Sequence, residues 1–414
     1  MRIPDAQTEK GVQAEEEILC ITSGIRERVI DAAMREGFDL AGIASVPMPG
    51  TDEHRRHHQR FTEWIQAGHS GEMHYLSRAN EQGDLLRSAI QTAFPWARSI
   101  ILCATNYNAQ APRSVDPAPT GTGWIARYAW SGSSPEDGGD SLLPTDYHDI
   151  MLRRLQAVER DLQEAFGETE WLQTKCYVDT GPVVERHLAQ LAGIGWIGKN
   201  ACVINQQRGS WMLLGTIVTS LPIRLEATLA PAADRCGSCT RCIDACPTDA
   251  LVLPYQMDAT RCIAYLTIEK KGGIPEPLRA GIGRQIFGCD ICQDVCPWNR
   301  HAPIGTHPEM QPRAELINPG LADLAAMDNI AFRRAFRGSP VERTGRKRLH
   351  RNVAIAMGNS GNPQHLPQLR EWSLGPDPTL AEAAEWAIQR IGELSHRRSN
   401  EVENGPNSQR SESL

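Results

Sequence analysis

Two cysteine-rich stretches decide the fold: CGSCTRCIDACP at residues 236–247 and CDICQDVCP at residues 289–297. Three thiolates at two-residue intervals, Cys236, Cys239 and Cys242, can wrap one corner of an iron-sulfur cube. A fourth cysteine that stands before a proline, here Cys246, ligates the other cluster in two-cluster ferredoxins. The pattern therefore predicts a ferredoxin-like region that carries two [4Fe-4S] clusters.

The second stretch lacks a cysteine at position 286, where Ile286 stands. Cys262 is the one cysteine between Cys246 and Cys289 and completes the count of eight ligands. Two zinc sites are the alternative, but zinc sites rarely use three cysteines at consecutive two-residue intervals before Cys-Pro. We expect one cluster on Cys236, Cys239, Cys242 and Cys296 and the other on Cys246, Cys262, Cys289 and Cys292. We expect the remaining cysteines to be small apolar side chains: Cys20, Cys103, Cys176 and Cys202.

The composition is that of an ordinary globular chain, with 414 residues and a formal net charge of −7. Its length allows two or three domains. The polar, acidic amino terminus does not resemble a signal peptide, and no apolar run is long enough to span a membrane. Twelve cysteines without such a signal indicate a reducing compartment. We therefore expect a cytoplasmic protein with no membrane contact.

Hydrophobic periodicity predicts a multidomain α+β or α/β chain. We expect disordered tails at residues 1–20 and 395–414, an α/β domain over 21–225, the cluster domain over 226–310 and a helical domain over 311–394. The predicted strands are 40–44, 99–104, 175–178 and 211–219, and residues 131–144 read as an exposed loop. The predicted helices are 25–36, 147–166, 183–192, 349–358 and 380–391.

Eight further segments carry a resemblance to a known family. They are ARYA (126–129), DYH (146–148), VDTGPVVER (178–186), AGIGWIGKN (192–200), GSWMLLG (209–215), RCIAYLTIE (261–269), GCDICQDVCPWN (288–299) and RNVAIAMGNSG (351–361). Together they resemble the epoxyqueuosine reductases, cobalamin-dependent iron-sulfur enzymes that complete the queuosine base of tRNA. The resemblance covers about residues 24–391.

The resemblance implies a cobalamin-binding α/β domain, a ferredoxin-like domain and a HEAT-like helical domain that helps to hold tRNA. It also implies an external low-potential electron donor, and we expect a monomer. The chain lacks the D-x-H-x-x-G signature through which many other cobalamin proteins supply a histidine to cobalt. The cobalamin contacts expected on the matching segments are Arg87, Tyr128, Asp146, Tyr147, His148, Gly198, Lys199, Asn200, Ser210, Trp211 and Leu214.

Asp179 is the expected proton donor, because removal of an epoxide oxygen as water takes two electrons and two protons. It lies at a predicted strand end, where burial would let a carboxyl donate near neutral pH. The alternative is an Asx-turn with its own backbone. Tyr147 and His148 could bind substrate or relay the second proton, or could simply pack and cap a helix.

The glycines of the 192–200 segment would let backbone approach a flat corrin, although glycines equally mark ordinary turns. Lys199 and Ser210 could hold the amide or phosphate groups at the corrin edge. The GIG at residues 193–195 lacks the spacing of a dinucleotide fingerprint.

Residues 329–352 form a local basic patch with one acidic residue, Glu342. Such a patch suits an RNA phosphate backbone, and the alternative is a solvated helix face. The expected tRNA contacts are Arg333, Arg334, Arg337, Arg343, Arg346, Lys347, Arg348 and Arg351.

Two other functions remain open from the sequence. One is a related corrinoid reductase of small molecules, such as a dehalogenase, for which we would expect an export signal and no basic helical domain. The other is a non-enzymatic electron carrier, which would leave Asp179 and the glycine-rich segments without a role.

Overall fold

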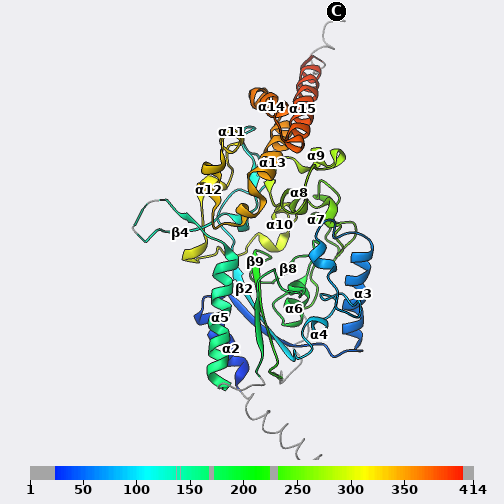
Figure 1. Cartoon of the computed structure of the whole chain (residues 1–414), viewed down its shortest axis with the longest axis vertical. Helices are drawn as coiled ribbons and strands as arrows, with labels where there is room; N and C mark the ends of the chain where they lie inside the picture. Colours follow the sequence, from blue (N-terminus) through cyan, green and yellow to red (C-terminus); the bar gives the residue numbers. More distant parts are fainter. Residues whose placement is uncertain (1–23, 137, 140, 167–171, 224–231, 404–414) are drawn as a thin grey trace, which may run out of the picture.

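In the computed structural model, residues 24–136, 138–139, 141–166, 172–223 and 232–403 are described. Three regions follow one another along the longest axis: a sheet region, a region of short helices around the cysteines, and a helical region (Figure 1). The predicted tail at residues 1–20, Cys20 and residues 404–414 lie outside the described residues.

A four-stranded antiparallel sheet forms the centre of the first region, in the order β1-β2-β9-β6. Its central strands are rich in β-branched and aliphatic residues, which favour a pleated, buried surface. All eight residues of β2 are buried, so both faces of the sheet are covered. The strands are β1 (Leu40–Ser45), β2 (Ser99–Asn106), β9 (Met212–Thr219) and β6 (Thr174–Tyr177).

Helices cover both faces of this sheet and form two separate cores. On one face, α2 (Ile25–Arg35) and α5 (Tyr147–Phe166) bury Val29, Met151 and Leu155 (Figure 1). On the other, α4 (Ile90–Ala93) and α6 (Glu185–Leu191) pack with Ile100 and Val218. The predicted strands and helices of this region are confirmed to within about two residues at each end.

The remaining elements are one longer helix, a short two-stranded pair and short 3₁₀ helices distributed over all three regions. They are α3 (Asp52–Gln66), β7 (Trp196–Ile197), β8 (Val203–Ile204), η1 (His74–Ser77), η2 (Arg127–Ala129), η3 (Ala259–Arg261), η4 (Pro297–Asn299), η5 (Pro308–Met310), η6 (Ala314–Leu316), η7 (Pro340–Thr344) and η8 (Pro363–His365).

The cysteine region is tied to the first region by a parallel pairing of β10 with β3 (Trp124–Ile125). Its elements are the short strand β10 and helices of four to seven residues, which leave tight loops free to present several thiols. They are α7 (Arg241–Asp244), α8 (Ile263–Ile268), α9 (Glu276–Ile282), β10 (Gln285–Phe287) and α10 (Ile291–Asp294).

The prediction of an exposed loop at residues 131–144 is wrong at both ends. β4 (Ser131–Ser133) pairs with β5 (Leu143–Pro144) and with β11 (Gln311–Pro312), and Ser131 is buried. Gly and Ser favour loops in isolation, but here the pairing partner β11 lies far away in sequence. Local composition could not indicate it.

The helical region is built around α13 (Gly345–Ser360), which is buried on nearly every side. α15 crosses it closely, because a Cβ added at Gly358 would lie 2.7 Å from Ala387 Cα. α15 continues to Glu403, beyond residue 394, where we expected ordered structure to end. The other helices are α11 (Leu321–Ala325), α12 (Asn329–Phe336) and α14 (Leu366–Ser373), with α15 spanning Pro378–Glu403.

Within the described ranges, no helix combines the length and the apolar character that crossing a membrane requires.

Gly42 offers a test of the packing of α6 on the sheet. An added Cβ would lie 2.2 Å from the carbonyl oxygen of Ala192, a backbone atom that cannot swing away. We expect Gly42→Ala to lower the free energy of unfolding by about 1–3 kcal/mol, as overpacking does. Gly121→Ala is the control, since its Cβ would meet nothing within 4 Å. Equal thermal melts of the two variants would contradict this packing.

Candidate functional site

Asp179 follows β6 in a left-handed backbone conformation, with φ of 56°. Non-glycine residues adopt this conformation at a cost of about 1–2 kcal/mol, and such strain is concentrated at functional sites. The carboxyl is not buried as we expected: the Asp179 side chain is 52% exposed. The phenol of Tyr147 donates a hydrogen bond to its Oδ2 atom.

The DYH segment meets Asp179 at the start of α5. Asp146 Oδ1 accepts a hydrogen bond of 3.0 Å from the His148 backbone N–H and lies 3.1 Å from its Nδ1. The Nε2 atom of His148 lies 3.6 Å from Asp179 Oδ2. The structure therefore brings four residues predicted from two separate segments into one cluster.

The pKa values of Tyr147 and Asp146 in this cluster are shifted in opposite directions. Burial, followed by the charge of Asp179, raises the pKa of Tyr147 well above its usual value, so the phenol keeps its proton. Burial alone would raise the pKa of Asp146, but hydrogen bonds from His148 and the charge of Arg343 outweigh it and lower that pKa. At neutral pH the site therefore holds a neutral phenol and an ionised Asp146.

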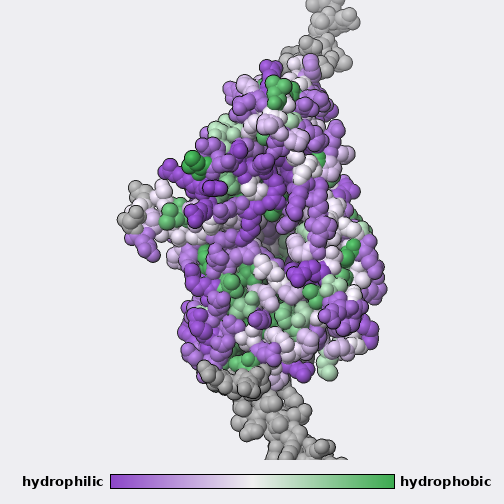
Figure 2. Space-filling model, viewed as in Figure 1, coloured by the Kyte–Doolittle hydropathy of each residue, from purple (hydrophilic) through white to green (hydrophobic). Residues whose placement is uncertain are grey.

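Aromatic side chains line a cavity beside the cluster. The rings of Tyr128 and Tyr147 meet edge to face with centroids 5.8 Å apart. Both line an empty volume of about 290 Å³ together with Tyr107, Leu213 and Met310. Figure 2 shows a hollow in the middle of this face, between the helical region and the sheet region, with hydrophobic surface on its sheet side.

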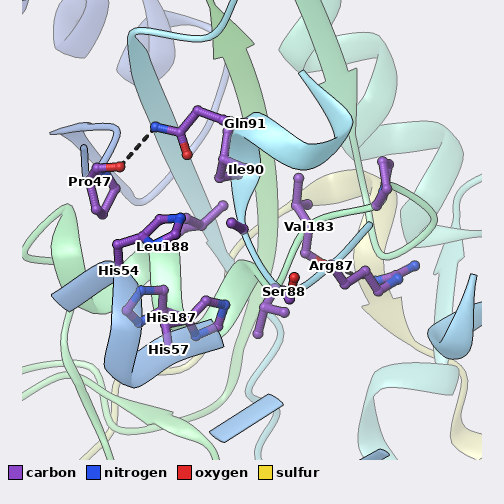
Figure 3. A pocket seen from close by; sticks show the side chains of 13 residues that line it. Pro47, His54, His57, Arg87, Ser88, Ile90, Gln91, Val183, His187 and Leu188 are labelled. Atoms are coloured by element: carbon purple, nitrogen blue, oxygen red, sulfur yellow. Dashed lines mark hydrogen bonds between the residues drawn. The ribbon is translucent and has the colours of Figure 1, made fainter. Parts of the chain in front are cut away.

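Arg87 lines a second pocket, of about 380 Å³, behind the loop that follows Asp179. Its Nη1 atom donates to the carbonyl of Val183 at 2.8 Å. On the opposite side, the rings of His57 and His187 stack at 3.9 Å (Figure 3). Burial lowers the pKa of these two histidines to about 4 and about 3, so both are neutral. Burial also lowers the pKa of His54, which lines the same pocket, so none of its three histidines favours the protonated form at neutral pH.

Several residues expected at the cofactor make their contacts with the cysteine region. Lys199 Nζ donates to the carbonyls of Gly237 and Cys239, at 2.6 and 3.0 Å. Asn200 reaches the carbonyl of Cys292 at 3.4 Å, and Ser210 Oγ donates to Gln293 at 2.9 Å.

Three expected cofactor contacts remain: Gly198 and Trp211 pack against neighbouring side chains, and Leu214 lies in the sheet. A Cβ added at Gly198 would meet Ile204 Cδ1 at 2.4 Å. The ring of Trp211 packs under the guanidinium of Arg127, 4.6 Å from the centroid. Leu214 is half-buried near the start of β9.

The thiols of the cysteine region fall into two sets, and within each set the charges of some thiols raise the pKa of others. Burial, together with the charges of Cys236 and Cys242, raises the pKa of Cys296 to about 11. Burial also raises the pKa of Cys242, where Cys236 and Cys239 contribute. These four thiols are the first predicted ligand set. Their proximity supports the grouping, and ligation itself stays a prediction.

The second group behaves in the same way. Burial raises the pKa of Cys289 well above its usual value, and the charges of Cys262 and Cys246 add to it. The pKa of Cys292 is raised by a hydrogen bond with Cys202 and by burial, with contributions from Cys289 and Cys262. These are the thiols expected on the second cluster.

Cys202 is the neighbour that the sequence did not indicate. It lies in hydrogen-bonding contact with Cys292, which lowers the pKa of Cys202. We had expected an inert apolar side chain, because nothing in the segment 192–204 marks its approach to the cysteine region. Among the described residues, no three His, Cys, Asp or Glu side chains converge as the ligands of a single ion would.

The basic patch divides into exposed and internal cations. Arg333, Arg334, Arg337 and Lys347 are exposed. Arg346 and Arg348 are half-buried, with Arg346 bonded to Asn329 and Arg348 to the carbonyl of Ile268. Arg343 reaches Asp146 and His148 of the Asp179 cluster.

Arg351 requires a correction. We expected it on the phosphate-binding surface, but it is 1% exposed. Its guanidinium donates to the carbonyls of Leu266, Lys270 and Gly272. A charge run does not tell which cations point inward, and this one satisfies buried carbonyls.

Two family descriptions match the chain. "Epoxyqueuosine reductase QueG, DUF1730" matches residues 87–180, and "4Fe-4S double cluster binding domain" matches residues 235–299. A curated epoxyqueuosine reductase of Xanthomonas campestris is 36% identical over 368 residues, which are 88% of this chain and 96% of that protein. One from Escherichia coli is 32% identical over 365 residues, covering 88% and 89%.

Solved structures of epoxyqueuosine reductases are also similar to this chain. A crystal structure of epoxyqueuosine reductase with an epoxyqueuosine-modified tRNA-Tyr stem loop has a TM-score of 0.76 and 30% identity, over 94% of this chain and 96% of that one. The Bacillus subtilis enzyme has a TM-score of 0.74 and 30% identity, over the same shares. A catabolic reductive dehalogenase is more distant, with a TM-score of 0.39 and 15% identity, covering 66% and 31%.

The ligand sets can be tested through Cys262. If it is the fourth ligand of the second cluster, Cys262→Ala should reduce the iron of the reconstituted protein from about eight to about four atoms per chain. Cys202→Ala is the matched control, because this neighbouring thiol is in neither predicted set and should leave about eight. Anaerobic iron and sulfide analysis checks both variants. The reverse outcome would assign the ligand to Cys202.

Proposed function

The chain belongs to the epoxyqueuosine reductase family, and we propose that Asp179 is the proton donor of the reaction that it catalyses. It is an oxidoreductase that acts on epoxyqueuosine in tRNA and carries a 4Fe-4S double cluster domain. Membership of the family decides among the functions that the sequence left open.

The arrangement around Asp179 is the observation that carries the proposal. Loss of the epoxide oxygen as water breaks two carbon–oxygen bonds and consumes two electrons and two protons. Asp179 presents a half-exposed carboxyl, bonded to the cavity-lining Tyr147, on a strained turn. Because Oδ2 accepts from Tyr147, Oδ1 is the oxygen free to take up a proton and pass it to the substrate. The Bacillus subtilis structure is described as having a catalytic loop, named for an aspartate, swung out of the active site.

We propose that cobalamin is the cofactor beside this carboxyl. The aromatic and apolar lining by Tyr128, Tyr147 and Leu213 suits the edge of a corrin. The cavity holds only part of such a cofactor, and the open hollow would take the rest. When bound, cobalamin would supply the low-potential reducing chemistry that the epoxide requires. The chain's own residues exclude water on the tyrosine side and hold the acid.

The predicted contacts divide accordingly. We propose that Tyr128 and Tyr147, which line the cavity, hold the cofactor together with His148, Trp211 and Leu214. Asp146 acts through His148, and Arg87 borders the loop from behind. Gly198, Lys199, Asn200 and Ser210 would instead set the distance between the cofactor and the clusters. Electrons would come from a separate low-potential donor and pass through the two clusters that the two sets of cysteines would hold. We also expect a cytoplasmic monomer.

We propose that tRNA lies against the helical region. Exposed arginines of α12, Arg333 and Arg334, and the neighbouring Arg337 offer phosphate contacts. The surface here is largely hydrophilic (Figure 2). A relative was crystallised with an epoxyqueuosine-modified tRNA stem loop, which supports RNA as the partner. The domain limits near residues 226, 311 and 394, and a HEAT-like pairing of α13 with α15, belong to the same proposal.

The acid can be removed without disturbing the turn. Asparagine tolerates positive φ and keeps an oxygen for Tyr147, so Asp179→Asn should fold normally. We expect kcat to fall by about 10²–10⁴, the usual worth of a general acid. Single-turnover conversion of epoxyqueuosine in a stem-loop RNA checks this, with iron content and cobalamin binding unchanged. Activity within a factor of about three of the parent would remove Asp179 from this role.

The RNA surface can be tested with matched charge removal. Arg333, Arg334 and Arg337 changed together to Ala should weaken stem-loop binding and reduce the slope of log K against log salt by about 2. The control removes the same charge from α3, through Arg55, Arg56 and Arg60, which are also exposed. Titrations at several salt concentrations would refute the assignment if both triple variants behave alike.

A further inference from the structure

Arg343 is the one member of the predicted phosphate-binding set that enters the cluster around Asp179. It lies on η7 (Pro340–Thr344), whose neighbouring residues Val341 and Thr344 are buried. Its Nη2 atom donates to Asp146 Oδ2 and lies 2.8 Å from His148 Nδ1. A residue 195 positions away in sequence thus contacts the histidine beside the proposed acid.

The contact at Nδ1 decides where the imidazole carries its proton. A guanidinium only donates, so the 2.8 Å contact from Arg343 favours a lone pair on Nδ1 over a hydrogen there, against the longer 3.1 Å contact to Asp146 Oδ1. The neutral ring then carries its hydrogen on Nε2. Nε2 is the atom that faces Asp179 Oδ2, at 3.6 Å. Without Arg343, Asp146 Oδ1 at 3.1 Å would favour hydrogen on Nδ1, and a lone pair would face the carboxyl oxygen.

The orientation of Asp179 follows from this tautomer. Its Oδ2 atom accepts from the Tyr147 phenol and faces the Nε2–H of His148. The hydrogen bond from Tyr147, with the Nε2–H facing the same oxygen at 3.6 Å, favours an orientation of the carboxyl in which Oδ1 has neither neighbour. A reversed imidazole would oppose that arrangement and misalign the acid.

We propose that Arg343 is a positioning residue: it selects the Nε2–H tautomer of His148, which in turn orients Asp179. The inference rests on the proposed role of Asp179 and deepens it. It also links the RNA-binding helical region to the acid, because η7 joins α12 to α13. Arg343 itself takes no part in the proton transfer.

A double-mutant cycle tests the proposal. The amide nitrogen of glutamine reaches about as far as Nε2 and always carries hydrogen, so His148→Gln needs no tautomer selection. We expect Arg343→Ala to lower kcat for stem-loop conversion about tenfold in the parent, through loss of orientation. In the His148→Gln background the same change should alter kcat less than about twofold. Arg343→Lys, which keeps a cationic donor, should recover part of kcat.

The kinetic parameters separate this role from phosphate binding. A phosphate contact, as proposed for Arg333, predicts that Arg333→Ala raises KM and leaves kcat unchanged. If Arg343→Ala also raises KM alone, equally in both backgrounds, the positioning role is overturned. Asp179→Asn assayed alongside decides the acid separately. An inactive Asp179→Asn with no coupling between Arg343 and His148 would reject only the present inference.

Discussion

One buried guanidinium, that of Arg351, fixes how the helical region meets the cysteine region. It donates to three backbone carbonyls around the end of α8, and the adjacent Asn352 amide donates to the carbonyls of Thr267 and Ile286. Charge-assisted bonds of this kind are stronger than neutral ones, and buried carbonyls left without donors would be costly. Because η7 ends where α13 begins, this anchor also sets the position of Arg343. The geometry around Asp179 therefore depends on a contact made in another region.

The sequence predicted the elements that follow from local periodicity. The strands of the sheet and helices such as α5 have apolar residues at spacings that only one kind of element can bury. The cysteine spacings likewise restricted the chemistry, because few sites use three thiols at two-residue intervals. Asp179 was identified by its position after a strand and by resemblance. Its neighbours Tyr147 and His148 came from a separate segment, and only the fold brings them together.

The sequence could not predict which way each charged side chain points. Arg343, Arg351 and Arg333 stand in one basic run, yet Arg343 contacts the Asp179 cluster, Arg351 is buried and Arg333 is exposed. Residue type predicts charge, and tertiary packing decides where the charge points. The same holds for Lys199 and Asn200, which the family resemblance placed at the cofactor but whose hydrogen bonds run to the thiol loops. Lys199 Nζ lies at the loop of the first cysteine set, next to Cys239. Positive charge at that place favours the reduced form of a bound cluster.

The left-handed backbone at Asp179 affects the fraction of molecules in which the loop holds Asp179 in the conformation described above. A penalty of about 1–2 kcal/mol alone would shift the balance between held and relaxed loop conformations by roughly five- to thirtyfold toward the relaxed one. Hydrogen bonds to the carboxyl must offset that bias, so the donors around it govern a conformational equilibrium as well as an orientation. A residue type that tolerates positive φ without strain would shift the equilibrium even if it had no acid. The choice of aspartate over glutamate at this position is thus constrained by the backbone as much as by chemistry.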